Sequence, residues 1–193
     1  MRSGYRCGCR ASAALVVLVL LTGCPTAPKS QEKKEALGAD VQATLRQMKA
    51  QDPSLQGFMD RGYGWALFPS VGKGGLIAGA AYGRGEVYRG NTMIGYSDLT
   101  QASLGLQAGG QQFSELIVFQ DQQALDRFTA SQFTFGANAS AIALKTGAGA
   151  AADFENGIAV FVMPKGGLMA ELSLSGQQFK FEPVGSGPTT RPQ

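Results

Sequence analysis

The stretch SVGKGGLIAGAAYGRGEVY, from Ser70 to Tyr88, decides how the chain folds. Its glycines stand among apolar residues and charges, which fits either a phosphate-binding loop or a strand that needs small residues. A Walker loop requires Ser or Thr after its lysine, whereas Gly74 follows Lys73. A dinucleotide-binding fingerprint that starts at Gly83 would need a third glycine where the chain has tyrosine. Both nucleotide-binding interpretations therefore fail.

The chain after Gly62 favours a strand for this stretch. Short apolar runs alternate with glycine-rich turns, namely YGWALFP, GGLIAGAAYGRGEVY, SLGLQAGGQQFSELIVF, IAVFVMP and GGLMAELSLSGQQFKFEP. Such runs are typical of strands joined by turns. Glycines inside long strands allow bulges, strong coiling and close approach of two backbones. We therefore predict an α+β fold whose mainly antiparallel sheet is strongly curved or barrel-like.

Two sequence patterns recur within these strands. GWALF and KGGLIA, within residues 64–78, return as GIAVF and KGGLMA within residues 157–170. GGQQF at 109–113 returns as SGQQF at 175–179. We interpret the pairs as an internal strand-turn-strand repeat, with coincidence among common residues as the alternative.

About three helices are predicted. The first covers residues 35–50, where apolar residues recur on one helical face, and it packs on the core or lies on a membrane surface. The second covers residues 53–61 with Asp52 as its cap, and the third begins with Asp121 as its cap in DQQALDRFTAS.

The N-terminus has the features of a bacterial export signal. Arginines precede the apolar run ASAALVVLVLL, from Ala11 to Leu21, which is far shorter than the ~20 residues that span a bilayer. The run ends in LTGC, which resembles the lipobox of bacterial lipoproteins and implies lipid attachment at Cys24, with an ordinary secretory signal as the alternative. Pro25 stands where an inner-membrane retention signal has Asp in enterobacteria, so we expect an outer-membrane lipoprotein that faces the periplasm.

The remaining segments follow from composition. We expect a signal peptide at 1–23, a lipidated flexible tether at 24–34, a folded domain at 35–182 and a disordered tail at 183–193. The signal holds three of the 17 Lys and Arg residues and none of the 14 Asp and Glu residues, so the mature chain has no net charge. Nucleic-acid binding is therefore not expected, because it needs a basic excess.

Few residues suited to catalysis are present. The chain has no histidine, and two of its three cysteines lie in the signal while the third, Cys24, would carry lipid. Triads, thiol nucleophiles and zinc clusters are thus excluded from the mature protein. A hydrolase with an acidic pair stays open as a lesser alternative, although the acidic residues are scattered, mostly beside turns. We expect no enzyme, no catalytic residue, no metal and no cofactor.

The candidate binding site consists of cations. Lys73 and Lys165 occupy equivalent turns of the repeat, and Arg84 and Arg89 lie along or after the first long strand. Lysines and backbone N–H groups at glycine turns can hold phosphate oxygens, as in a lipid head group. The alternative is that these side chains are simply solvated and protect strand ends from pairing.

The sequence also resembles a known family. Ala-Leu-Phe-Pro-x-Val at 66–71, the glycine-rich strand ending at Val87, IGYSD, GLQAGGQ and the apolar strand before Asp121 resemble the SYLF domain over residues 37–181. The resemblance implies binding of anionic phospholipids, with phosphoinositides and sometimes actin as ligands of other members. Two departures limit how far the ligands of other members apply to this chain. Many relatives have Trp in the turn where this chain has Tyr96, and the lipid on Cys24 would already attach this protein to a membrane. We expect a non-catalytic lipid-binding lipoprotein, or alternatively an adaptor that contacts envelope proteins.

Overall fold

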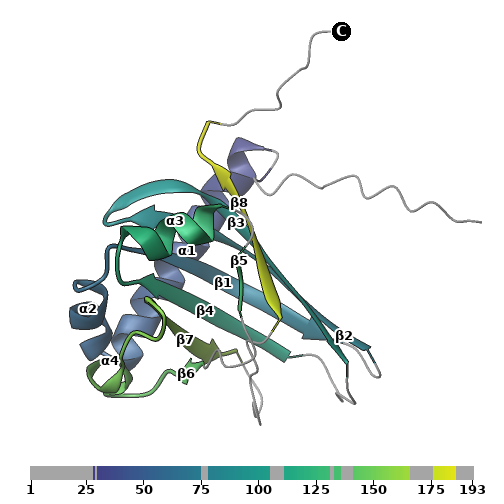
Figure 1. Cartoon of the computed structure of the whole chain (residues 1–193). Helices are drawn as coiled ribbons and strands as arrows, with labels where there is room; N and C mark the ends of the chain where they lie inside the picture. Colours follow the sequence, from purple (N-terminus) through teal and green to yellow (C-terminus); the bar gives the residue numbers. More distant parts are fainter. Residues whose placement is uncertain are drawn as a thin grey trace, which may run out of the picture.

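The computed structural model describes residues 28, 30–74, 78–104, 111–130, 133–135, 141–165 and 176–185. Their elements are α1 (Gln31–Gln51), α2 (Ser54–Met59), β1 (Gly64–Gly74), β2 (Ala78–Arg89), β3 (Thr92–Leu104), β4 (Gln111–Phe119), α3 (Gln122–Thr129), β5 (Phe133–Thr134), β6 (Ile142–Ala143), α4 (Ala148–Ala151), β7 (Ile158–Pro164) and β8 (Gln177–Pro183). The strands form one sheet in the order β5-β8-β3-β2-β1-β4-β7-β6 (Figure 1). Neighbouring strands pair antiparallel, except the parallel pair β6 and β7. The predicted α+β class is confirmed.

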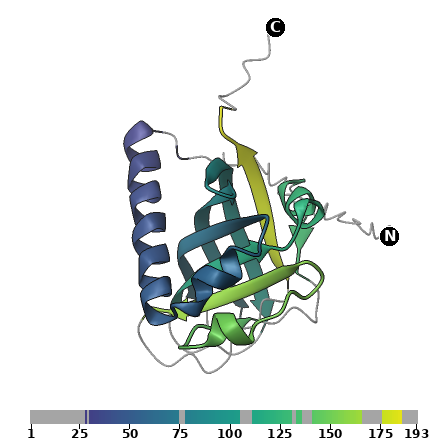
Figure 2. The ribbon, with the colours of Figure 1, turned by 90° about the vertical axis from the view of Figure 1, so that its left-hand side faces the viewer.

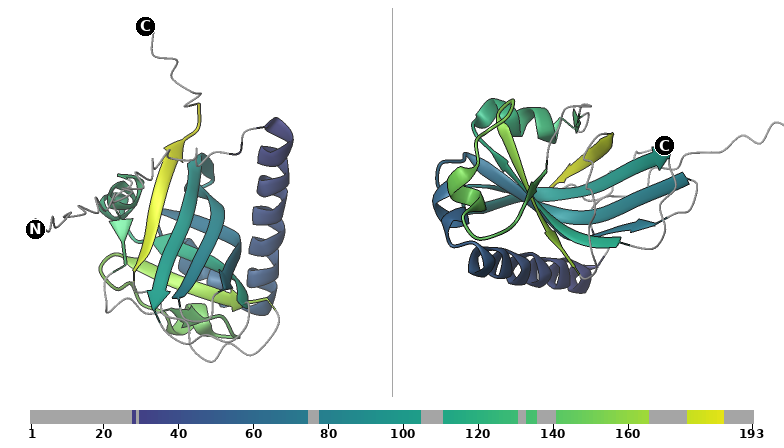
Figure 3. Two further views of the ribbon diagram at one scale, coloured as in Figure 1. Left: turned by 90° about the vertical axis from the view of Figure 1, so that its right-hand side faces the viewer. Right: turned by 90° about the horizontal axis from the view of Figure 1, so that it is seen from below.

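The sheet curls until distant strands face each other. Three strands separate β4 from β8 in the sheet order, yet the Gln177 amide on β8 donates a hydrogen bond of 3.0 Å to Glu115 on β4. Strands are about 4.8 Å apart, so a flat sheet would separate these two by roughly 19 Å. The rings of Phe68 on β1 and Phe179 on β8 also meet, with centroids 5.6 Å apart. The predicted curved sheet is thus a half-barrel with a concave inner face (Figure 3).

Both faces of the sheet are buried at β1, β4 and β7, which explains the continuous apolar runs of these strands. The outer face of β8 is exposed at Gln178 and Lys180. The inner face carries a phenylalanine-rich core, and α3 covers it with Phe128. The outer face packs against α1 and α2 and forms a second core with them. α1 contributes Val41, Leu45 and Met48 to this outer core. Figure 2 shows α1 lying along the outside of the sheet. The first predicted helix therefore packs on the core through its apolar face.

A bulge in β1 accommodates a proline inside the sheet. Phe68 is paired with Glu115 but Val71 with Phe113, so three steps along β1 match two along β4. Phe68 and Val71 consequently both reach the inner core. Pro69 lies within the bulge, where a missing N–H breaks no ladder bond, and its carbonyl accepts a hydrogen bond of 2.8 Å from the Ser114 hydroxyl.

The glycines of β2 make room for this bulge. A Cβ atom at Gly83 would lie 2.7 Å from Cγ2 of Val71 and 3.2 Å from the carbonyl oxygen of Ser70. A Cβ atom at Gly85 would collide with the carbonyl oxygen of Leu67. The opening stretch is therefore mainly strand, as predicted, and two of its glycines allow β1 and β2 to approach closely.

The GWALF and GIAVF copies of the proposed repeat both form strands, but equivalent side chains point to opposite faces of the sheet. GWALF lies in β1, and the last four residues of GIAVF lie in β7. Phe68 belongs to the inner core, whereas its counterpart Phe161 belongs to the outer one. Because side chains alternate along a strand, the two copies present opposite faces. GGQQF and SGQQF do correspond, since Phe113 and Phe179 both enter the inner core, while KGGLMA lies mostly outside the described residues.

The helices agree with expectation, with three differences. α2 has Pro53 at its N-cap position instead of Asp52, which lies at the C-cap of α1. α1 begins at Gln31, inside the expected tether, because the Ser30 hydroxyl caps it by accepting from the N–H of Lys33. Asp121 caps α3 as predicted, through a hydrogen bond of 2.8 Å from the N–H of Ala124. The short α4 was not predicted. Its sequence, AGAA, has no apolar periodicity, and contacts with distant residues define it.

Candidate functional site

The backbone brings two of the four predicted cationic positions to one end of the sheet. Lys73 pairs with Gln111 of β4, and the N–H of Lys165 donates to the carbonyl of Gln112. Positions 73 and 165 therefore flank β4, about two strand spacings or roughly 10 Å apart. We call this the 73/165 end of the sheet.

The other two cations lie elsewhere. Nε and Nη2 of Arg84 donate to the two carboxylate oxygens of Asp98, at 2.7 and 3.2 Å, and the Tyr82 hydroxyl donates to the same carboxylate. The hydrogen bond with Asp98 raises the pKa of Arg84. Arg89 pairs with Gly64 at the start of β1, so roughly 30 Å of strand separate it from position 73. A site shared by all four cations is not formed, and Cys24 lies outside the described residues.

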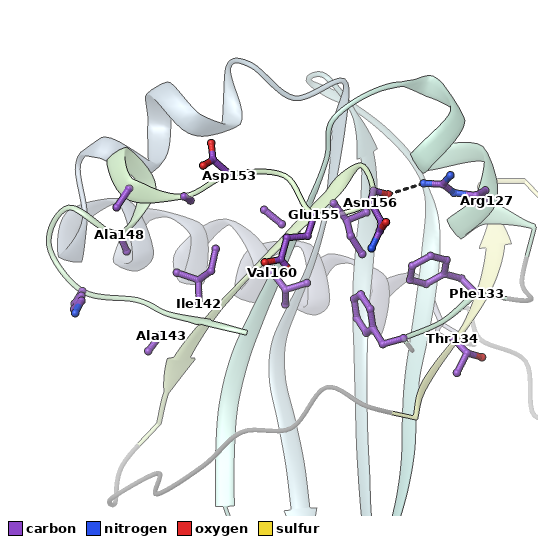
Figure 4. A pocket seen from close by; sticks show the side chains of 16 residues that line it. Arg127, Phe133, Thr134, Ile142, Ala143, Ala148, Asp153, Glu155, Asn156 and Val160 are labelled. Carbon is purple, nitrogen blue, oxygen red and sulfur yellow. Dashed lines mark hydrogen bonds between the residues drawn. The ribbon is translucent and has the colours of Figure 1, made fainter. Parts of the chain in front are cut away.

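A cavity of about 850 Å³ lies between the two end strands of the half-barrel. Phe133 and Phe135, in and after β5, line one side, and Ile142, Ile158 and Val160 of β6 and β7 line the other. Alanines of α4 complete the wall (Figure 4). Since β5 and β6 end the sheet order, the cavity occupies the place where a closed barrel would pair its first and last strands.

Four ionisable residues also line the cavity, two of each sign: Arg127, Lys145, Asp153 and Glu155. Nη2 of Arg127 donates a hydrogen bond of 2.8 Å to the carbonyl of Asn156. Figure 4 shows Arg127 beside Phe133 at one end of the cavity and Asp153 beside Ala148 at the other. The cavity thus combines an apolar lining with four ionisable side chains, and no sequence motif predicted it.

A buried aspartate fixes the α4 wall. Asp52 is fully buried and accepts hydrogen bonds from the N–H and hydroxyl of Ser54, at 3.1 and 2.7 Å. It also accepts from the N–H groups of Gly147 and Gly149, at 3.0 and 2.7 Å. Burial raises the pKa of Asp52, but these hydrogen bonds outweigh it and leave the pKa below its ordinary value. Asp52, predicted only as a cap, therefore joins the corner between α1 and α2 to α4.

A second buried acid lies inside the half-barrel. Glu115 is fully buried between Phe113 and Ile117, and burial raises its pKa to about 8 although the hydrogen bond from Gln177 lowers it. Within the described residues its Oε1 has no hydrogen-bond partner. The sequence analysis grouped Glu115 with acids beside turns. The alternation of Phe113, Glu115 and Ile117 could have shown that its side chain points to the core.

A third acid is covered by α1. Glu86 on β2 is 5% exposed, and its Oε2 accepts a hydrogen bond of 2.7 Å from the Tyr88 hydroxyl. Burial raises the pKa of Glu86, and the bond from Tyr88 opposes that rise. Across the described part of the chain, His, Cys, Asp and Glu side chains form no group of three that could hold a metal ion.

The comparison with protein families supports the resemblance. The sequence model of the family described as Ysc84, Las17-binding protein actin regulator, matches residues 100–183. Residues 100–183 are therefore similar to this family, the SYLF family, and we call them the SYLF region. The matched region begins in β3 and ends with β8, so the SYLF region includes Glu115, Gln177 and every described residue that lines the cavity.

Similarity to a curated protein extends beyond the SYLF region. Beta cell expansion factor A of Aeromonas veronii is 25% identical over 154 residues, which cover 79% of this chain and 59% of the relative. The chain thus spans about three fifths of that relative's length. No helix in the described part of the chain is long and apolar enough to cross a membrane.

Proposed function

We propose that the protein is a lipid-anchored component of a bacterial cell envelope whose folded domain binds an anionic phospholipid or a related amphiphile, without catalysis. The SYLF region supports the lipid class, and the lipobox-like LTGC sequence supports attachment through Cys24. In this proposal the protein is held at the outer membrane and faces the periplasm.

The observation that carries the proposal is the placement of positions 73 and 165 on either side of β4. Each cation near an anionic membrane contributes about 1 kcal/mol, within a screening length of about 8 Å at physiological salt. Two lysines at one end of the sheet can therefore hold one anionic surface together. Arg84 contributes less, because Asp98 already offsets its charge.

Vesicle co-sedimentation tests this proposal. The chain from residue 24 to 193 with Cys24→Ser contains every described element and lacks the lipid. It should bind anionic phospholipid vesicles, and the Lys73→Gln, Lys165→Gln variant should lose roughly tenfold to thirtyfold in affinity. Raised salt should also lower the affinity of the parent for these vesicles.

The structure offers a matched control at the opposite end of β1. Arg61 and Arg89 are both exposed there, and an Arg61→Gln, Arg89→Gln variant removes the same charge. This variant should bind vesicles nearly as well as the parent. Equal losses from both pairs would indicate generic electrostatics, and absence of vesicle binding by the parent would favour an adaptor that contacts envelope proteins.

A further inference from the structure

We propose that the cavity between β5 and β6 binds a single amphiphile molecule, with one acyl chain inside and an anionic head group beside Arg127. The inference deepens the proposed function, on whose ligand class it rests, but it uses another part of the molecule. The cavity contacts Ile158 and Val160 near the start of β7, whereas Lys165 follows the end of that strand. Extraction of one lipid molecule and adhesion to a membrane surface are thus assigned to separate sites.

The size and lining of the cavity fit an acyl chain. Pockets that bind small molecules measure about 300–1,000 Å³ and are mostly apolar, and this cavity measures about 850 Å³. Phe133, Ile142 and Ile158 are only partly buried although they line it. An apolar chain that covers these side chains gains about 25 cal/mol for each Å² of surface removed from water. The partly covered apolar side chains therefore provide the driving force.

The short end strands argue against a peptide as the occupant. A bound peptide strand needs a row of backbone N–H and C=O groups as partners. β5 and β6 are each two residues long, and β6 already pairs with β7 through its other edge. An acyl chain needs no hydrogen bonds, so it suits a site with little backbone to offer.

Arg127 selects the charge of the head group. Its guanidinium has five N–H donors, and one of them holds the Asn156 carbonyl. Asn156 and Gly157 have left-handed backbones, with φ of 54° and 82°, in the turn that presents this carbonyl to α3. Arg127 and Phe133 both line the cavity, so the anchored guanidinium and the apolar lining belong to one site (Figure 4). Carboxylates and phosphates match the remaining donors of such a fork.

The test uses a dansyl-labelled undecanoic acid and the unlipidated chain described above. The fluorescence of the dansyl group should rise and shift to the blue when the probe binds, and unlabelled palmitate should reverse both changes. Ala151→Trp places a large side chain in the cavity from α4 and should weaken binding at least tenfold. Ala150→Trp is the matched control, because Ala150 is exposed on the same helix but does not line the cavity. Ala143→Trp on β6 fills the cavity from another wall and should repeat the loss.

The head group is tested with a second probe. Arg127→Gln should weaken binding of the acid probe roughly tenfold and leave binding of the corresponding dansyl-labelled alcohol unchanged. Glu155→Gln should leave binding of the acid unchanged or strengthen it. Arg46→Gln, an exposed position on α1, should change neither probe.

The outcomes separate the two proposals. The Lys73→Gln, Lys165→Gln variant should still take up the probe, and Ala151→Trp should still bind vesicles. Probe binding without vesicle binding would contradict the proposed membrane-binding site at the 73/165 end of the sheet and would leave the cavity proposal standing. No probe binding by the parent, equal losses from Ala150→Trp and Ala151→Trp, or equal effects of Arg127→Gln on acid and alcohol would overturn the assignment of the cavity.

Discussion

Glu115 is an acid among several polar side chains that are buried in the sheet, with Ser97, Gln101 and Gln177. It stands in a strand between two apolar neighbours, and its partner, the Gln177 amide, comes from the far edge region of the curled sheet. A carboxyl in such surroundings favours its neutral form, because burial penalises the charged one. Its protonation is therefore linked to folding.

This linkage predicts a specific pH dependence. The pKa of Glu115 is about 8 in the folded protein, above its ordinary value of 4.5, so its proton stabilises the fold fully below pH 4.5 and less as pH rises toward 8. Glu115→Gln should remove this loss, which is on the order of 3 kcal/mol. Chemical denaturation at pH 5 and pH 8 measures it. Glu32→Gln, exposed on α1, should keep the parent's pH dependence, and an unchanged slope in Glu115→Gln would contradict the neutral interior acid.

Gly83 is a second position with a single-residue consequence. A larger side chain there meets Val71 and the backbone of Ser70, so Gly83→Val should destabilise the protein by about 1 to 3 kcal/mol. Thermal melting checks this. Gly72→Val is the matched control, since a Cβ atom at Gly72 meets nothing within 4 Å. If both variants melt like the parent, the close approach of β1 and β2 is not what requires glycine. Gly79, also in β2, has no described surroundings from which to argue.

At the scale of elements, the contact between Asp52 and α4 joins segments that lie far apart in the sequence. Asp52→Ala removes the acceptor of the N–H groups of Gly147 and Gly149 and should cost about 3 kcal/mol, because buried donors would lose their partner. Hydrogen exchange should accelerate at both glycines. Asp40→Ala, on the exposed face of α1, should leave exchange there unchanged. Protection that persists in Asp52→Ala would show that α4 is held by packing alone.

Elements with a local signal could be predicted, and those defined by distant contacts could not. The cap Asp121, the apolar spacing of α1 and the glycine-rich strands all lie within a few residues of what they determine. α4 has only Gly and Ala and depends on Asp52 from the other half of the chain. The cavity likewise forms from β5 and β6, which are too short to show a period. Lys73 and Lys165 were predicted from equivalent turns, and Arg84 and Arg89 from their place along or after one long strand. Strand register, which has no local signal, places Arg89 roughly 30 Å from position 73.

For the whole molecule, the proposed localisation depends on lipid attachment at Cys24. If LTGC is a lipobox, Cys24→Ser should abolish palmitate labelling and leave an unlipidated precursor. The parent should fractionate with the outer membrane. Labelling that survives the substitution would exclude lipid attachment at Cys24, and recovery of the parent in the inner membrane would contradict the sorting inferred from Pro25.

The contacts of β8 with β3 and β4 also have a consequence for the order in which the domain folds. β8 is the last strand of the described residues, yet it pairs Pro183 with Gly95 and supplies Phe179 and Gln177 to the interior. Until it arrives, β1, β2 and β3 can form a local meander, but Phe68 and Glu115 face an unfinished interior. Contacts between distant parts of a chain form slowly. If the chain is exported from its N-terminus as proposed, it should therefore stay incompletely folded until β8 has crossed the membrane, and a rigid half-barrel would not obstruct its passage.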